Sequence, residues 1–153
     1  MIMKMNKKGV TLLELIVVMA IIAIGAVLTV PNLGPWLANY RLRSATRDIT
    51  STLRTAQMKA VSINLDHRVT FTEGTGNAGS YVLERNTGGV DWIREGVSQT
   101  LPAGIQLTTN FPSLRVVFKP NSAVEQGGSI SLQNPRGTRT ITVSPSTGRI
   151  TNQ

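Results

Sequence analysis

The hydrophobic and polar positions of this chain change their pattern twice. From Val10 to Val30 almost every side chain is apolar, and residues 15–28 contain no charged or polar side chain. A helix over this stretch would be about 30 Å long, because each residue adds about 1.5 Å, and this length matches the hydrocarbon core of a bilayer. Lys7 and Lys8 precede the stretch, as in N-termini that stay in the cytoplasm. We therefore predict a transmembrane and assembly helix over residues 10–30.

The acidic side chain in this apolar stretch is Glu14. An ionisable group inside a membrane costs free energy, which indicates a functional site whose partner has to be found. A cleaved secretory signal is one alternative, but its apolar part is shorter and ends at a small-residue site, which Pro31-Asn32-Leu33 does not provide. An ordinary membrane anchor is a second alternative. It explains the length and the lysines but not the glutamate.

Residues that interrupt helices follow the apolar stretch. Pro31, Gly34 and Pro35 remove backbone donors or weaken a helix, so we predict a kink or hinge over residues 31–35. Trp36 and Tyr40 come next, one helical turn apart. These two side chains suit either the aromatic belt at a membrane surface or packing against the domain that follows.

A second helix is predicted over residues 36–62, because apolar residues recur there every three or four positions. They form one stripe that we expect to pack on a sheet: Leu42, Ala45, Ile49, Leu53, Ala56 and Ala60. Arg43, Arg47 and Arg54 share another face of this helix. A basic face of this kind is either solvated or binds an acidic subunit or nucleic acid.

The pattern changes again beyond Ser62, where short β-rich runs are separated by turn residues. Alternation is clearest where Leu114, Val116 and Phe118 share one face. The predicted strands are Arg68–Thr72, Tyr81–Arg85, Asp91–Arg94, Ile105–Thr108, Leu114–Lys119, Ser129–Gln133, Arg139–Val143 and Arg149–Thr151. We expect an α+β fold in which the amphipathic helix packs on an antiparallel, β-rich globular head over residues 63–153.

Composition narrows the chemistry of the chain. It has 153 residues, enough for one domain beyond the anchor, and a formal net charge of +8. A basic surface suits anionic lipid, nucleic acid or an acidic protein and does not choose among them. Since cysteine is absent, the chain can form neither a disulfide nor a thiolate metal site.

The sequence offers no set of residues suited to catalysis. His67 is the single histidine, and a metal site or a histidine relay needs further ligands or a nucleophile. We expect it to be an ordinary surface or junction residue. Four acidic residues of the head, Glu73, Glu84, Asp91 and Glu95, are scattered over predicted strands and turns. We therefore expect a protein without enzymatic activity, cofactor or metal.

The segment Lys8-Gly9-Val10-Thr11-Leu12-Leu13-Glu14, followed by an apolar helix, resembles the class III leader of type IV pilins and type II secretion pseudopilins. The resemblance implies that a prepilin peptidase on the cytoplasmic side removes residues 1–9 by cutting after Gly9. It also implies methylation of the new N-terminus, Val10, where the family usually has phenylalanine. Glu14 would neutralise the α-amine of a neighbouring subunit during filament assembly, and Pro31 falls where family members carry a kinking proline.

The head is similar to the GspH/FimT group of minor pseudopilins and minor pilins. The elements that carry this similarity are a tryptophan strand at Asp91-Trp92-Ile93, a turn at Leu101-Pro102-Ala103-Gly104, a strand at Val116-Val117-Phe118-Lys119-Pro120 and a closing element at Ser146-Thr147-Gly148-Arg149-Ile150. The resemblance implies a structural subunit that helps to initiate or cap a type IV pilus or a type II secretion pseudopilus.

The same resemblance implies where the protein works and with what. It would cross the bacterial inner membrane once, with its C-terminal head in the periplasm, and would then enter a periplasmic pseudopilus or a surface pilus. Its partners would be other pilin or pseudopilin subunits, the prepilin peptidase, the inner-membrane assembly platform and membrane lipid.

DNA uptake is the alternative function. Some FimT-like minor pilins are associated with it through a basic C-terminal G-R-x-R element, and this chain reads Gly148-Arg149-Ile150-Thr151 there, without the second arginine. Arg136 and Arg139, on the preceding turn and strand, could partly substitute. A DNA site built from Arg136, Arg139 and Arg149 would act through phosphate contacts, so its affinity would fall steeply as salt rises.

Overall fold

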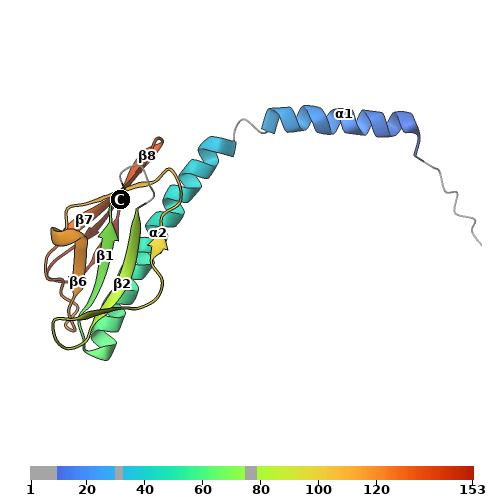
Figure 1. Cartoon of the computed structure of the whole chain (residues 1–153). Coiled ribbons are helices and arrows are strands. Elements are labelled where there is room, and N and C mark those ends of the chain that lie inside the picture. Colours follow the sequence, from blue (N-terminus) through green and yellow to red (C-terminus); the bar gives the residue numbers. More distant parts are fainter. Residues whose placement is uncertain (1–9, 30–32, 75–78) are drawn as a thin grey trace, which may run out of the picture. The chain divides into compact units, whose positions relative to one another are not determined.

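The computed structural model describes residues 10–29, 33–74 and 79–153, and the chain divides into two compact units, Met1–Trp36 and Leu37–Gln153. Figure 1 shows the helices α1 and α2 and the strands of the head. Each unit is described by itself. Gly9, Val30, Pro31 and Asn32 lie outside the described residues, so the predicted leader and the first proline of the predicted kink are not part of the description that follows.

Helix α1 (Leu12–Thr29) is capped at its start by Thr11. The Oγ1 atom of Thr11 accepts a hydrogen bond of 3.2 Å from the backbone N–H of Glu14, which makes Thr11 the N-cap residue, and the sequence T-x-x-E is that of a capping box. Residues 10–26 are all exposed. Among the described residues, no helix is both long and apolar enough to cross a bilayer. The transmembrane role of residues 10–30 stays a prediction.

Helix α2 (Leu33–Ile63) begins earlier than the predicted residue 36. Gly34 and Pro35 therefore lie in its first turn and not in a separate hinge before it. A proline is tolerated there, because the first backbone N–H groups of a helix have no partner within the helix. The helix ends before Asn64, whose φ of 57° places it in the left-handed region typical of a residue that terminates a helix.

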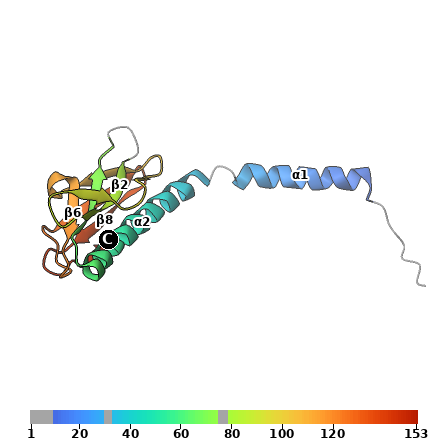
Figure 2. The same cartoon turned by 60° about the horizontal axis from the view of Figure 1, so that its bottom comes forward.

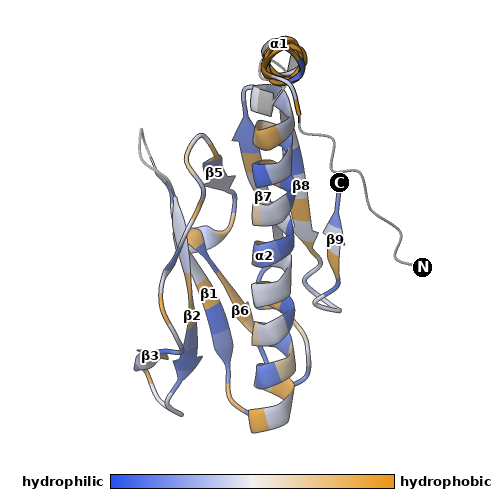
Figure 3. Cartoon of the chain, turned by 90° about the vertical axis from the view of Figure 1, so that its right-hand side faces the viewer, coloured by the Kyte–Doolittle hydropathy of each residue, from blue (hydrophilic) through white to orange (hydrophobic). Residues whose placement is uncertain are grey.

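The apolar stripe predicted for this helix is buried as expected. Its members have exposed fractions between 0% and 4%: Leu42, Ala45, Ile49, Leu53, Ala56 and Ala60. Figure 3 shows α2 lying across the strands of the head, and Figure 2 shows that it runs along one side of them. The prediction was accurate because a helix that packs on a sheet must repeat apolar residues at the helical period.

The strands form two antiparallel sheets. The first has the order β3-β2-β1-β6, with a short strand β4 that also pairs with β2. Its members are β1 (His67–Thr72), β2 (Ser80–Asn86), β3 (Trp92–Arg94), β4 (Gln99–Thr100) and β6 (Arg115–Phe118). The second has the order β5-β7-β8-β9. It consists of β5 (Gln106–Thr109), β7 (Gly128–Asn134), β8 (Gly137–Val143) and β9 (Ile150–Asn152).

The α+β fold and the antiparallel head are thus confirmed. Every predicted strand has an observed counterpart with slightly different ends, and β4 was not predicted. Leu114 does not belong to the strand that we assigned to it. It ends a short 3-10 helix (Pro112–Leu114) with a φ of 53°, so the alternation that we assigned to it starts only at Val116.

Candidate functional site

The residues predicted to act in processing and assembly lie around the start of α1. Val10 is 72% exposed and Glu14 is also exposed. Glu14 occupies the third position of the helix, where a negative charge interacts favourably with the partial positive charge of the helix N-terminus. Sequence reasoning treated this glutamate only as an assembly residue. The pattern Thr11-Leu12-Leu13-Glu14 also signals a helix start and could have been recognised as such.

The single histidine of the chain is fully buried at the junction between α2 and β1, so of the two expected positions, surface or junction, the surface is wrong and the junction is confirmed. His67 starts β1, directly after the turn that follows α2, and its exposed fraction is 0%. Its Nδ1 atom lies 2.8 Å from the carbonyl oxygen of Leu65. Because a carbonyl can only accept, Nδ1 must be the donor. The other ring nitrogen, Nε2, lies 3.6 Å from Oε2 of Glu95.

Glu95 is the point at which three elements meet. Its Oε2 atom lies 2.6 Å from Nζ of Lys59 on α2, and its Oε1 atom lies 3.2 Å from Nε of Arg85 on β2. The hydrogen bond from Lys59 is the main cause that holds the pKa of Glu95 below its ordinary value; burial opposes it, and the charges of Lys59, His67 and Arg85 add to it. This cluster contains no nucleophile poised beside a base. We interpret it as a structural clamp between α2 and the first sheet.

A second carboxylate, Glu84, lies next to Arg85 on β2 and links β2 to β1. Burial alone would raise its pKa, but hydrogen bonds from Arg68 (2.6 Å) and Thr70 (2.8 Å) outweigh burial and lower it. Arg68 also lies over the ring of Trp92, 4.2 Å from its centroid, a cation–π contact. The tryptophan strand is thereby fixed to β1. Within the described residues no cluster of acidic side chains and histidine suits a metal ion.

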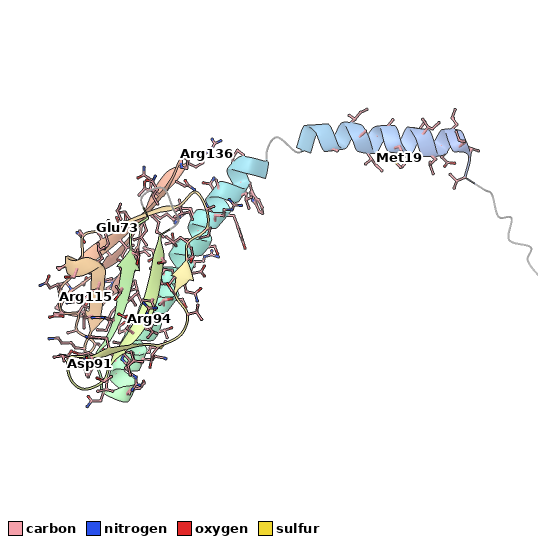
Figure 4. The ribbon with its side chains drawn as sticks, in the orientation of Figure 1. Met19, Glu73, Asp91, Arg94, Arg115 and Arg136 are labelled. Atoms are coloured by element: carbon pink, nitrogen blue, oxygen red, sulfur yellow. The ribbon has the colours of Figure 1, made fainter. Side chains whose placement is uncertain are left out.

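The three arginines proposed for DNA binding are not brought together. Arg136 lies in the turn that joins β7 to β8, and Arg149 lies in the connection from β8 to β9. They therefore flank opposite ends of β8, whose seven residues span about 20 Å. Figure 4 shows Arg136 at one end of the head. Arg139 lies between them, within β8.

The turn that carries Arg136 is anchored to α2 by a buried asparagine. The Nδ2 atom of Asn134 donates to the carbonyl oxygen of Ala38 (2.9 Å), and its Oδ1 atom accepts from the backbone N–H groups of Arg136 (2.8 Å) and Gly137 (3.0 Å). One side chain thus shapes the hairpin and fixes it to the helix. No signal in the local sequence distinguishes this asparagine from those in exposed turns.

Arg139 instead joins the basic face of α2. It lines a surface hollow together with Arg43, Thr46 and Arg47 of α2 and Asn152 of β9. A neighbouring hollow shares Arg47 and Asn152 with the first and continues along α2 past Thr50, Ser51, Arg54, Thr55 and Met58. The two predicted sets of arginines, one on the helix and one on the C-terminal strands, thus meet at Arg139.

Comparisons with known proteins were made over the whole chain. The model of the prokaryotic N-terminal methylation motif matches residues 4–30, and that of type II transport protein GspH matches residues 45–147. Comparison with curated protein sequences gives no match.

Solved structures of two proteins are similar to this fold. The type IV minor pilin FimU of Pseudomonas aeruginosa has a TM-score of 0.57 at 13% identity, over 72% of this chain and 91% of that chain. The minor pseudopilin EpsH of the type 2 secretion system of Vibrio cholerae has a TM-score of 0.56 at 14% identity, over 76% and 95%. At these identities the similarity establishes the fold.

Proposed function

Because the chain belongs to the GspH family of minor pilins and pseudopilins, we propose that it is a structural filament subunit that helps to initiate or cap a type IV pilus or a type II secretion pseudopilus. The observation that carries the proposal is the order of two matches in one chain. A prepilin-type N-terminal motif over residues 4–30 precedes a GspH head over residues 45–147. The N-terminal match supports anchoring and processing, and the second match supports a head of the GspH type.

Processing begins with cleavage between Gly9 and Val10 by the prepilin peptidase and continues with methylation of the new N-terminus. Until then the apolar helix keeps the chain in the inner membrane, surrounded by lipid, with the head in the periplasm. The processed subunit then binds the inner-membrane assembly platform and the other pilin or pseudopilin subunits. The exposed apolar side chains of α1 support a helix that is covered by lipid and then by other subunits, since Leu12, Ile16 and Ile21 are each more than half exposed in the isolated chain.

Glu14 gives the assembly step its specificity. In an apolar surrounding a carboxylate needs a compensating charge and hydrogen bonds. Cleavage before Val10 creates a free amine about one helical turn away from Glu14 or on an adjacent helix. A subunit whose glutamate finds such an amine in its neighbour gains free energy on assembly, whereas a lone subunit pays the cost of an unpaired charge.

We do not propose DNA uptake through the predicted arginine set as a second function, because Arg136 and Arg149 flank opposite ends of β8. A mobility-shift titration with duplex DNA at low and moderate salt tests this decision. Retardation at low salt that is lost in the variants Arg136→Ala and Arg149→Ala would reinstate the DNA function.

Mass spectrometry of the chain recovered from cells that express the peptidase tests the main proposal. We expect a mature protein that starts at Val10 and is recovered with the filament fraction. Recovery of a chain that still starts at Met1 and stays in the membrane fraction would contradict it.

A further inference from the structure

The side of α2 that faces away from the core carries an unusual row of residues. We name it the α2 row, and its members are Tyr40, Arg43, Arg47, Arg54, Met58 and Val61. Their spacings of three, four or seven positions place them along one line of the helix. Tyr40, Met58 and Val61 are 58%, 64% and 48% exposed, and the three arginines are also exposed. The row therefore has a basic centre and an apolar patch at each end.

The basic centre has no acidic partner among the described residues. Within the residues that the structure describes, none of the ion pairs involves Arg43, Arg47 or Arg54. Arg139 adds a fourth guanidinium from β8, and no acidic residue lines either of the two hollows beside the row. Like charges held this close together repel one another, so a ligand with negative charge would relieve the repulsion.

The residue types of the row favour a protein ligand over nucleic acid. Tyrosine, methionine and arginine are enriched at the centres of protein interfaces, where lysine, aspartate and glutamate are depleted, and the row contains none of these last three. Surfaces that bind duplex DNA are in contrast more polar and more strongly positive than protein interfaces. Here the apolar ends, Tyr40 on one side and Met58 with Val61 on the other, give a protein partner the area to bury that phosphates would not use.

The spacing of the row also favours a helix as its partner. The steps of three, four, seven, four and three residues keep the row on one narrow line of α2, and a line of this kind suits the packing of one helix along another. A second copy of this chain does not fit. In a parallel pair each arginine would face its own counterpart, and in an antiparallel pair centred between residues 50 and 51, where Tyr40 would meet Val61, Arg47 would face Arg54.

We propose that the α2 row docks a helix of a different filament subunit, one with acidic side chains at its centre and apolar side chains at both ends. This inference rests on the proposed function, because it assumes that other subunits surround the head. It assigns a task to the arginines of α2 and to Arg139: they select an acidic neighbour, and they disfavour the pairing of two copies of this chain. The row thus helps to set the order of subunits.

Disulfide crosslinking in cells tests the inference on the full-length chain, produced together with the peptidase and the other subunits. Because the chain has no cysteine of its own, Ser51→Cys introduces one thiol beside the row, in the hollow that Arg47 and Arg54 also line. Thr108→Cys on the exposed edge of β5 is the matched control. Second cysteines are placed along the exposed helices of the other subunits. We expect Ser51→Cys, and not Thr108→Cys, to crosslink to a helix with acidic residues.

Charge reversal then tests the role of the arginines. The pair Arg47→Glu and Arg54→Glu should lower the crosslinking yield at least about tenfold, whereas Arg115→Glu on β6, far from α2 in Figure 4, should leave it unchanged. Replacing the acidic residues of the partner helix by arginine should restore the yield. That restoration requires direct pairing, since a misfolded head could not be rescued in this way.

Three results would overturn the inference while leaving the proposed function intact: normal crosslinking and incorporation of the Arg47→Glu/Arg54→Glu variant, crosslinks between two copies of the Ser51→Cys chain, or binding of duplex DNA that depends on Arg47 and Arg54. Failure of the unmodified chain to enter filaments is a different result. It would contradict the proposed function and the inference with it.

Discussion

Glu95 shows how a single residue can tie distant parts of the head together. Its carboxylate oxygens lie close to the side-chain nitrogens of Lys59 on α2, Arg85 on β2 and the buried His67 on β1. The Nε atom of Arg85 and Nε2 of His67 are buried and make no hydrogen bond among the described residues. The nearby carboxylate of Glu95 compensates both nitrogens, so the cluster needs its charge as well as the hydrogen bond that it accepts from Lys59.

Replacing Glu95 by glutamine should therefore destabilise the head. The substitution keeps the size of the side chain but leaves Lys59 and Arg85 without a counter-charge at a partly buried site, which typically costs about 1–3 kcal/mol. Chemical denaturation of the full chain in detergent measures the change. Glu125→Gln is the control, because that glutamate is exposed. Equal stability of the two variants would show that the clamp contributes nothing.

Acid should weaken the head through the same carboxylates. The pKa values of Glu84 and Glu95 lie below the ordinary value of 4.5 in the folded chain, so the folded state binds fewer protons than the unfolded state. The stability that they contribute is fully present above the ordinary carboxyl pKa and is lost as pH falls through the lowered values. Denaturation midpoints measured from pH 6 down to about pH 3 should fall, and less steeply in the Glu84→Gln variant.

At the scale of the elements, the connection between β8 and β9 requires a glycine at one position. Gly148 has a φ of 59° and lies against α2 and a neighbouring loop. A Cβ atom at this position would collide with the backbone oxygen of Ser122 and with the side-chain amide of Gln57. The close approach holds the C-terminal hairpin near α2, where Arg139 and Asn152 line the hollows beside the α2 row.

The variant Gly148→Ala should be clearly less stable than the wild type, and Gly88→Ala serves as its control. Gly88 also has a positive φ, 91°, but a Cβ there would meet nothing within 4 Å. The control thus measures only the backbone cost, about 1 kcal/mol. Thermal denaturation should show a larger loss for Gly148→Ala, because the collision adds to that cost. A smaller or equal loss would mean that the loop moves aside freely.

The parts of the fold that could be predicted are those that residues close together in the sequence determine. The buried stripe of α2 could be predicted because its period repeats within one segment. The burial of His67 and the contact of Gly148 with Ser122 depend on residues far away in the chain, so no local pattern reveals them. The separation of Arg136 from Arg149 is different. The predicted strand Arg139–Val143 stands between them in the sequence, so their separation could have been inferred.

At the scale of the whole molecule, the two units differ in whether they bury their own apolar side chains. The head closes its own core with α2 and two sheets, whereas residues 12–26 of α1 are all exposed and mostly apolar. An apolar surface of this kind is typical of a segment that other molecules cover. The position of Glu14 in the first turn of α1 then matters in two ways, since its backbone N–H donates to the N-cap residue Thr11 and its side chain carries the charge that we assign to assembly.

Substitutions at these two positions separate capping from charge. Glu14→Gln removes the charge but retains a residue that suits a capping box, so it should still insert in the membrane and should be incorporated into filaments at least about tenfold less. Thr11→Ala removes the cap, costs about 1 kcal/mol of helix stability and leaves the charge, so it should be incorporated almost normally. Immunoblots that compare the sheared filament fraction with the membrane fraction measure both. If Glu14→Gln is incorporated like the wild type while Thr11→Ala fails, the glutamate serves the helix start and not the neighbouring amine.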